Sequence, residues 1–147
     1  MKSFVRNFLE YNHSSNDKVI SLLEKHKEEL PEKCITLFSH ILNAQEIWNA
    51  RILGKQPEFK VWDVSNLAEF RNFNQRFFSG SIAILEEFNL DQKIDYRTSK
   101  GDPFISTVQD ILIHVVNHGS YHRGQIMQLL RDEVNDAIST DYIFYKR

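Results

Sequence analysis

The chain has 147 residues, of which 41% are apolar, and its formal net charge is −2. A chain of this length is typical of one domain, here spanning residues 1–147, and its interspersed charges disfavour a nucleic-acid partner. No run approaches the roughly 18 apolar residues of a membrane span, and the first residues lack a signal-peptide core. We therefore expect a soluble, cytoplasmic protein without membrane contact. Cys34 is the single cysteine, so no internal disulfide can form.

The first half of the chain predicts two helices. Apolar residues at helical spacing predict the first helix from Ser3 to about Lys27, with a polar stretch at residues 12–16 that could kink it. Pro31 suits the first turn of the second helix, and Gly54 suits its C-terminal stop.

A loop over residues 54–64 then separates the second helix from a third. We expect this loop to cross the end of a bundle and Trp62 to plug that end. Ser65 or Asn66 caps the third helix, with Glu69 in the position that completes a capping box. Helical spacing places one apolar stripe on the third helix: Phe70, Phe73, Phe77, Phe78, Ile82 and Leu85.

Between the third and fourth helices, residues 92–97 and 103–105 flank a turn-rich segment. This pattern fits either a short hairpin or an extended crossover. The fourth helix begins at Ser106 or Thr107 and carries a regular apolar face as far as Leu130.

Two further features concern the fourth helix and the tail. Gly119 and Gly124 each cost about 1 kcal/mol against alanine inside a helix, which indicates close approach of a neighbouring backbone or of a ligand. The segment 140–147 is rich in aromatic residues and should dock on the bundle.

The whole chain thus contains four amphipathic helices and almost no strand signal, which predicts an all-α bundle.

The fourth helix also carries a stripe of histidines. His114, His118 and His122 follow one another at intervals of four, and two imidazoles at this spacing can direct their nitrogens at one metal ion. Spacing alone does not choose between the pair 114/118 and the pair 118/122. The third ligand must come from another helix, and His40 lies on the buried face of the second helix. Three protein ligands would leave an open coordination position, as in catalytic sites.

At these residues the chain resembles the DinB/YfiT-like metalloprotein family, a superfamily of four-helix bundles that includes thiol-dependent S-transferases and a mycothiol-dependent isomerase. The resemblance covers most of the chain and rests on these segments: Leu37 to Ala44, Trp48, Arg51-Ile52, Asn117-His118, His122-Arg123-Gly124-Gln125 and Asp141-Tyr142. It implies an antiparallel four-helix bundle with a short hairpin around residues 96–104 between helices 3 and 4. It also implies that His40, His118 and His122 are the metal ligands and that the protein is a homodimer.

Other polar residues near the ligands have less defined roles. His114 would support the ligands or line the pocket, together with Asn43, Tyr121 and Gln125. Arg123 could bind a carboxylate on a neighbouring helix or an anionic substrate. No residue stands out as a general base, so catalytic residues are not assigned.

These features support two main hypotheses. The first is a metal-dependent thiol S-transferase or hydrolase-like enzyme that binds a small thiol and a small-molecule electrophile, because a metal-bound sulfur becomes a nucleophilic thiolate. The second is a non-catalytic, stress-related metal-binding bundle that dimerises. A third and weaker reading is a metal-free polar network of histidines, which would be costly to desolvate. One divalent ion is expected, zinc or nickel before iron, although imidazole ligands also suit copper.

Overall fold

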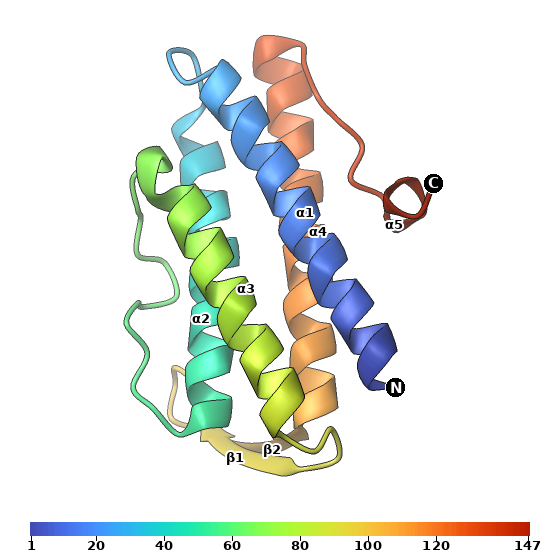
Figure 1. Cartoon of the computed structure of the whole chain (residues 1–147). Helices are drawn as coiled ribbons and strands as arrows, with labels where there is room; N and C mark the ends of the chain where they lie inside the picture. The colour runs from blue at the N-terminus through green and yellow to red at the C-terminus, as the bar shows by residue number, and fades with distance from the viewer.

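The structure is a computed structural model that describes residues 1–147, and most of these residues are helical. Its elements are α1 (Lys2–Lys25), α2 (Glu32–Leu53), the 3-10 helix η1 (Leu67–Glu69), α3 (Phe70–Glu87), β1 (Lys93–Arg97), β2 (Pro103–Thr107), α4 (Val108–Val134) and α5 (Tyr142–Tyr145) (Figure 1). The predicted helical character is confirmed. The two-stranded sheet and the short helix α5 make the molecule more than a pure four-helix bundle.

The four long helices pack side by side, but they do not alternate in direction. Figure 1 shows α1 and α4 running one way and α2 and α3 running the other way. Helix α2 packs against α4 and α3, and α1 packs against the same two helices. The bundle is therefore not antiparallel throughout, because α2 and α3 are parallel neighbours.

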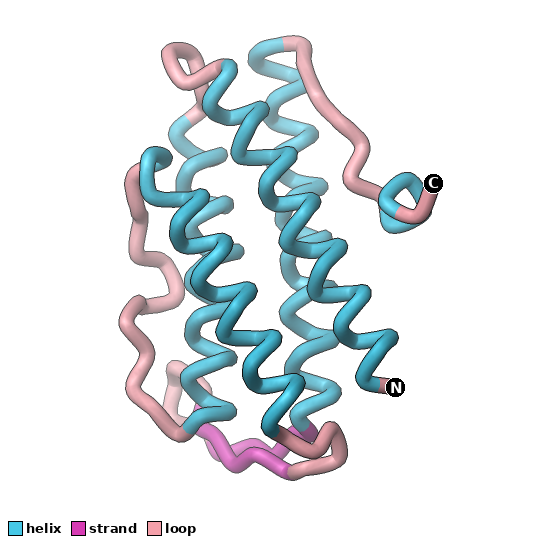
Figure 2. Tube along the Cα trace, in the orientation of Figure 1, coloured by secondary structure: helices cyan, strands magenta, loops and turns pink.

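The connection after α2 explains this topology. Figure 2 shows the loop of residues 54–66 returning along the side of the bundle, where the sequence had predicted a crossing at its end. The backbone N–H of Glu58 donates to Oε1 of Glu46 (3.1 Å), and the backbone N–H of Ser65 donates to Oγ of Ser39 (3.1 Å). Later residues of the loop therefore contact earlier residues of α2, which means that the two segments run antiparallel.

The helix boundaries follow the residues that the sequence singled out. Gly54 ends α2 in a left-handed conformation with φ 66°, which glycine adopts without steric cost. The side chain of Asn66 caps η1 and not α3, whose N-cap residue Glu69 makes no side-chain cap hydrogen bond, so the predicted capping box of the third helix is not formed. The hydroxyl of Thr107 caps α4 by accepting the backbone N–H three residues ahead (3.1 Å). Pro31 occupies the N-cap position itself, one residue before α2 begins.

Strands β1 and β2 form an antiparallel hairpin, which decides between the two predictions for this segment. Lys93 lies opposite Thr107, and Arg97 lies opposite Pro103. The hairpin crosses one end of the bundle between α3 and α4 (Figure 2). It thereby brings the side chains of β1 close to the end of α2.

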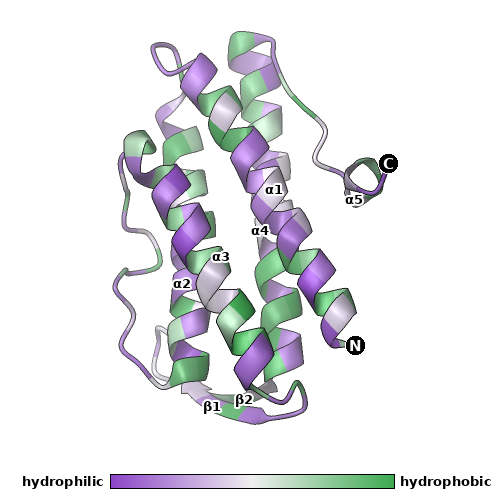
Figure 3. Cartoon of the chain, in the orientation of Figure 1, coloured by the Kyte–Doolittle hydropathy of each residue, from purple (hydrophilic) through white to green (hydrophobic).

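Two apolar clusters fill the interior, one toward each end of the bundle. Hydrophobic and hydrophilic stretches alternate along the long helices (Figure 3). In every long helix a buried polar residue lies between the positions that serve the two clusters: Asn12, Ser15 and Asn16 in α1, Gln45 and Asn49 in α2, Ser81 in α3 and Arg123 in α4. None of the helices combines the length and apolar character needed to cross a lipid bilayer.

Arg123 is the centre of this polar layer. Its side chain is fully buried, and its Nη1 donates to Oδ1 of Asn12 (2.7 Å) and of Asn16 (2.7 Å). Nη2 donates to Oγ of Ser120 (3.1 Å), and the guanidinium carbon lies 5.5 Å from the ring centroid of Tyr11. The polar stretch of α1 is thus continuous helix, and it supplies the partners of a buried cation.

The other side of the layer joins α2 to α3. Nε2 of Gln45 donates to Oγ of Ser81 (3.0 Å), and that hydroxyl donates to Oδ1 of Asn49 (2.9 Å). Nδ2 of Asn49 donates in turn to the carbonyl of Phe77 (3.0 Å). Buried polar groups are tolerated here because each finds a partner.

The C-terminal segment docks on α1, as predicted. The hydroxyl of Tyr142 accepts a hydrogen bond from Nδ2 of Asn7 (2.7 Å), and its ring lies edge-on to Tyr11 at 5.2 Å. The hydroxyl of Tyr11 donates to the carbonyl of Thr140 (2.6 Å).

The two glycines of α4 provide a matched pair of substitutions. A Cβ at Gly119 would lie 2.5 Å from Oδ1 of Asn12 and 2.9 Å from Nη1 of Arg123, two atoms that are hydrogen-bonded to each other. Nothing lies within 4 Å of a Cβ at Gly124, so no close approach explains that glycine. We expect Gly119→Ala to destabilise the protein by about 2 kcal/mol and Gly124→Ala to stabilise it by about 1 kcal/mol. Urea unfolding measures both, and equal effects would contradict this packing.

A surface contact between α1 and the end of α4 predicts a pH dependence. Nε2 of His26 lies 2.8 Å from Oδ2 of Asp136, and its Nδ1 lies 3.2 Å from Oε1 of Glu29. Hydrogen bonds to Asp136 first and Glu29 second raise the pKa of His26, and hydrogen bonds from Lys25 and His26 lower the pKa of Asp136 to about 2.

Because the pKa of His26 is raised, its protonation stabilises the folded state fully at pH values below the ordinary pKa of histidine. This stabilisation is lost as the pH rises through the raised pKa. The lowered pKa of Asp136 stabilises the fold above its ordinary value and ceases to do so as pH falls toward about 2. The contact should therefore stabilise most between about pH 4 and 6.5. The free energy of unfolding, measured across this pH range in the wild-type protein and in His26→Gln, tests the prediction. An NMR titration in which His26 has the ordinary pKa of histidine would contradict it.

Candidate metal centre

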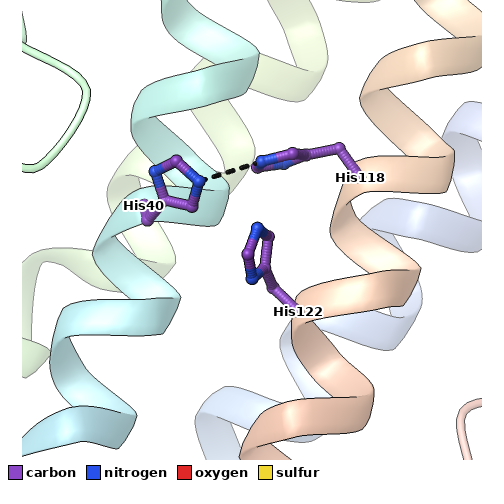
Figure 4. A group of neighbouring side chains, drawn as sticks. All are labelled: His40, His118 and His122. Carbon is purple, nitrogen blue, oxygen red and sulfur yellow. Dashed lines mark hydrogen bonds between the residues drawn. The ribbon is translucent and has the colours of Figure 1, made fainter.

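Three histidines from two helices meet at one side of the bundle. His40 lies on α2, and His118 and His122 lie one turn apart on α4. One nitrogen from each of them lies within 4.8 Å of the others, which is close enough for the group to hold a metal ion. Figure 4 shows the three rings directed toward a common space between the helices.

The packing of α2 against α4 produces this convergence. Nε2 of His118 lies 3.0 Å from Nε2 of His40. The ring centroid of His40 lies 4.7 Å from that of His118 and 4.7 Å from that of His122. His40 is 8% exposed, His122 is 9% exposed and His118 is half-buried, so the site is largely shielded from water.

Hydrogen bonds on the outer side orient two of the rings. Nδ1 of His40 lies 3.0 Å from the carbonyl oxygen of Val61, and Nδ1 of His122 lies 2.7 Å from Oε1 of Gln125. Both oxygens are acceptors only, so each Nδ1 carries the proton. The inner nitrogen of each ring therefore presents a lone pair.

This donor set fits a divalent metal ion. Burial lowers the pKa of His118 to about 3, and the nearby imidazoles of His122 and His40 add to the effect. Burial also lowers the pKa of His40. Neutral imidazoles are the form that binds metal, and zinc–nitrogen bonds of about 2.0–2.1 Å require ligand nitrogens roughly 3.3 Å apart. The spacing of His40 and His118 is close to this value.

Trp62 covers one face of the site. Its ring is stacked on the imidazole of His40, with centroids 3.9 Å apart and planes at 8°. The predicted plug at the end of the bundle was wrong, because the loop runs along α2 and leaves Trp62 54% exposed at its side. Nδ2 of Asn43 donates to the carbonyl of Asp63 (2.7 Å) and so holds this part of the loop.

A pocket of about 490 Å³ opens beside the histidines. His122 forms part of its wall, together with Trp62 and Tyr121. Tyr121 is 65% exposed, and its ring lies edge-on to His122 at 5.0 Å. Gln125 also lines this pocket, so both predicted pocket residues on this turn of α4 adjoin the site.

His114 lies outside the group of three. Its ring centroid is 5.7 Å from His118 and 5.3 Å from Trp48, and its side chain is exposed. Arg123 also points away, into the polar layer, where it bonds to Asn12, Asn16 and Ser120. The expectation that Arg123 binds a carboxylate or a substrate anion is therefore corrected by its burial among amide and hydroxyl groups.

Sequence reasoning missed two groups that orient or cover the ligands. The carbonyl of Val61 has no signal in the sequence, because any residue supplies one. Trp62 was noted, but its partner was not. The bond between His122 and Gln125 could have been inferred, since residues three apart are neighbours on a helix.

Comparison with known proteins agrees with this picture. The family model described as "DinB family" matches residues 1–147, the whole chain. A relative in Bacillus subtilis (strain 168), "Protein DinB", is 24% identical over 164 residues, which cover 99% of this chain and 95% of the relative. These matches confirm the resemblance that the histidine motif indicated.

One outer and one inner hydrogen bond predict the tautomers of His40 and His118 in protein stripped of metal by a chelator. His40 should carry its proton on Nδ1, because it donates to Val61. His118 should carry its proton on Nε2, because that nitrogen must donate to the bare Nε2 of His40. Long-range ¹H–¹⁵N correlations of the imidazole rings measure this. A proton on Nε2 of His40 would contradict the arrangement.

Proposed function

The chain belongs to the DinB family, and on that basis we propose that it binds one divalent metal ion and acts as a metal-dependent thiol S-transferase. The observation that carries the proposal is the group of three histidines, whose ligand nitrogens lie within 4.8 Å of one another. His40, His118 and His122 are the proposed ligands. Three protein ligands leave a coordination position for a substrate, whereas structural zinc sites use four.

Zinc and nickel are the proposed ions, with iron as a further choice, because all three accept imidazole ligands. A bound divalent ion would supply one chemical effect, which is to hold a thiol as its nucleophilic thiolate at neutral pH. The protein supplies orientation. Val61 and Gln125 fix the outer nitrogens of two ligands, and such outer bonds typically affect metal affinity 10- to 100-fold, as an order of magnitude.

The pocket beside His122 is the proposed binding place for the small thiol and the electrophile. Trp62 and Tyr121 give it aromatic walls, and Gln125 contributes an amide. Trp62 also shields the ring of His40 from water. Asn43 acts through the loop that carries Val61 and Trp62. His114 lies one turn before His118, toward the start of α4.

An alternative proposal is a non-catalytic metal-binding protein with a role in stress. The ligands come from α2 and α4, so an ion would join two helices and stabilise the folded state.

In either case we propose a homodimer, as the family resemblance implies. Ile143 and Phe144 of α5 are 54% and 47% exposed and are available for such a contact, which light scattering would test.

The metal content of the purified protein tests the proposed ligands. Protein prepared without a histidine tag or added metal should contain about one divalent ion per chain. His40→Ala and His122→Ala should lose the ion while keeping their helicity, because two imidazoles hold it poorly. His114→Ala is the matched control on the same helix and should keep it. Metal loss in His114→Ala with retention in His122→Ala would overturn the assignment.

A catalytic assay with a thiol and an electrophile distinguishes the proposed S-transferase from the non-catalytic metal-binding protein. The S-transferase proposal expects metal-loaded protein to couple cysteine to 1-chloro-2,4-dinitrobenzene, and His40→Ala to lose this activity. A protein that holds the ion but leaves the reaction with a panel of small thiols at its uncatalysed rate would favour the non-catalytic alternative. A wild-type protein that cannot be loaded with zinc, nickel or iron would overturn both.

A further inference from the structure

Arg51 is a half-buried arginine that has no acidic partner. It takes part in none of the ion pairs of the protein. Its guanidinium carbon lies 4.3 Å from the ring centroid of Trp48 and 5.2 Å from that of Tyr96. The two rings stand edge to face, 5.0 Å apart at 78°, so together they form an aromatic clamp.

The clamp holds the cation without using its hydrogen-bonding capacity. Aromatic faces attract a guanidinium through their π-electrons, which leaves its N–H groups free to donate. Arg51 lies in the last turn of α2, where the helix dipole favours a positive charge. Burial lowers the pKa of Arg51. A desolvated guanidinium with unused donors is well suited to bind an anion from outside.

A pocket of about 670 Å³ adjoins this guanidinium, between α2, the loop of residues 54–66 and the hairpin turn. Lys60 adds a second cation. The carboxylate of Asp63 is engaged locally, because its Oδ2 accepts the backbone N–H of Lys60 (2.8 Å). The apolar part of the wall includes Ile47, Phe59 and Trp62. Such a mixture of apolar walls and a few polar groups is typical of small-molecule sites of this volume.

The pocket also adjoins the histidines. Trp62 lines it, lines the pocket that contains His122, and stacks on His40. His40 and Arg51 are eleven residues apart on α2, which places them on one face and about 16 Å apart along the axis. A ligand that extends along α2 could thus reach both.

We propose that Arg51 is the anion-recognition residue of a site for an organic anion, meaning a carboxylate or phosphate joined to an apolar body. The anionic group binds the free edge of the clamped guanidinium, and the apolar body lies against Phe59 and Trp62. This proposal goes beyond the proposed function, because anion recognition at Arg51 needs no metal. The two can therefore fail separately.

The two tryptophans of the chain make the test direct, because Trp48 forms the clamp and Trp62 lines the pocket. Their indole N–H signals can be followed by NMR in chelated, metal-free protein during titration with benzoate, phenyl phosphate or the neutral analogue benzyl alcohol. Both anions should shift both signals saturably. Benzyl alcohol should bind roughly tenfold more weakly, because charge-assisted hydrogen bonds are lost. The two anions together show whether carboxylate or phosphate is preferred.

Variants connect the effect to Arg51. Arg51→Gln should bind both anions roughly tenfold more weakly than the wild-type protein and should bind benzyl alcohol with unchanged affinity. Arg51→Lys should bind at an intermediate level, because it keeps the charge but loses the planar fork. Arg131→Gln, at an exposed arginine in the last turn of α4, is the matched control and should bind like wild type.

Three outcomes would overturn the proposal. They are equal affinity for benzoate and benzyl alcohol in the wild-type protein, wild-type anion binding in folded Arg51→Gln, and anion binding that appears only when metal is present. The first comparison needs no variant, so it decides the matter even if Arg51→Gln does not fold. Anion binding in a protein that cannot be loaded with metal would support this site while overturning the proposed function.

Discussion

The fully buried guanidinium of Arg123 is the interaction on which the rest of the structure depends. It lies between two apolar clusters, where leaving its N–H groups unpaired would cost several kcal/mol, as an order of magnitude. Asn12 and Asn16 from α1 accept hydrogen bonds from its Nη1, whereas its Nε has no partner. Gly119 makes room for the contact with Asn12. A slide of α1 past α4 by one turn would break these bonds. The polar layer thus sets the relative position of the helices more strictly than apolar packing alone does.

The position of α4 has a direct consequence for the candidate metal centre. Arg123 faces the interior, and its neighbour His122 faces α2 on an adjacent side of the same helix. Fixing α4 through Arg123 therefore also fixes the direction of the histidine stripe. The long loop then completes the centre, because its return along α2 brings the carbonyl of Val61 and the ring of Trp62 to His40. A short connection after α2 would have left His40 without either group.

Helix α2 also connects two chemically different positions on one face. Near its middle, His40 presents a neutral nitrogen to two other imidazoles. In its last turn, Arg51 presents a cation held by Trp48 and by Tyr96 from the hairpin. The hairpin is thus more than a connection between α3 and α4, because it supplies half of the aromatic clamp. Trp62 stacks on His40 and lines both pockets.

The sequence by itself determined the four long helices, the stop at Gly54 and the family, because periodicity, turn chemistry and the histidine motif are local properties. It left two candidates at the start of the third and of the fourth helical segment, and the structure places the caps at Asn66, before η1, and at Thr107. It also named the three histidines, although spacing left His114 and His122 equivalent. Only the tertiary structure decided that α2 and α3 run in parallel, that residues 12–16 face a buried arginine, and that Val61 and Trp62 meet His40. These contacts join residues far apart in the chain, and they depend on the path of a loop whose own residues carry no periodic signal.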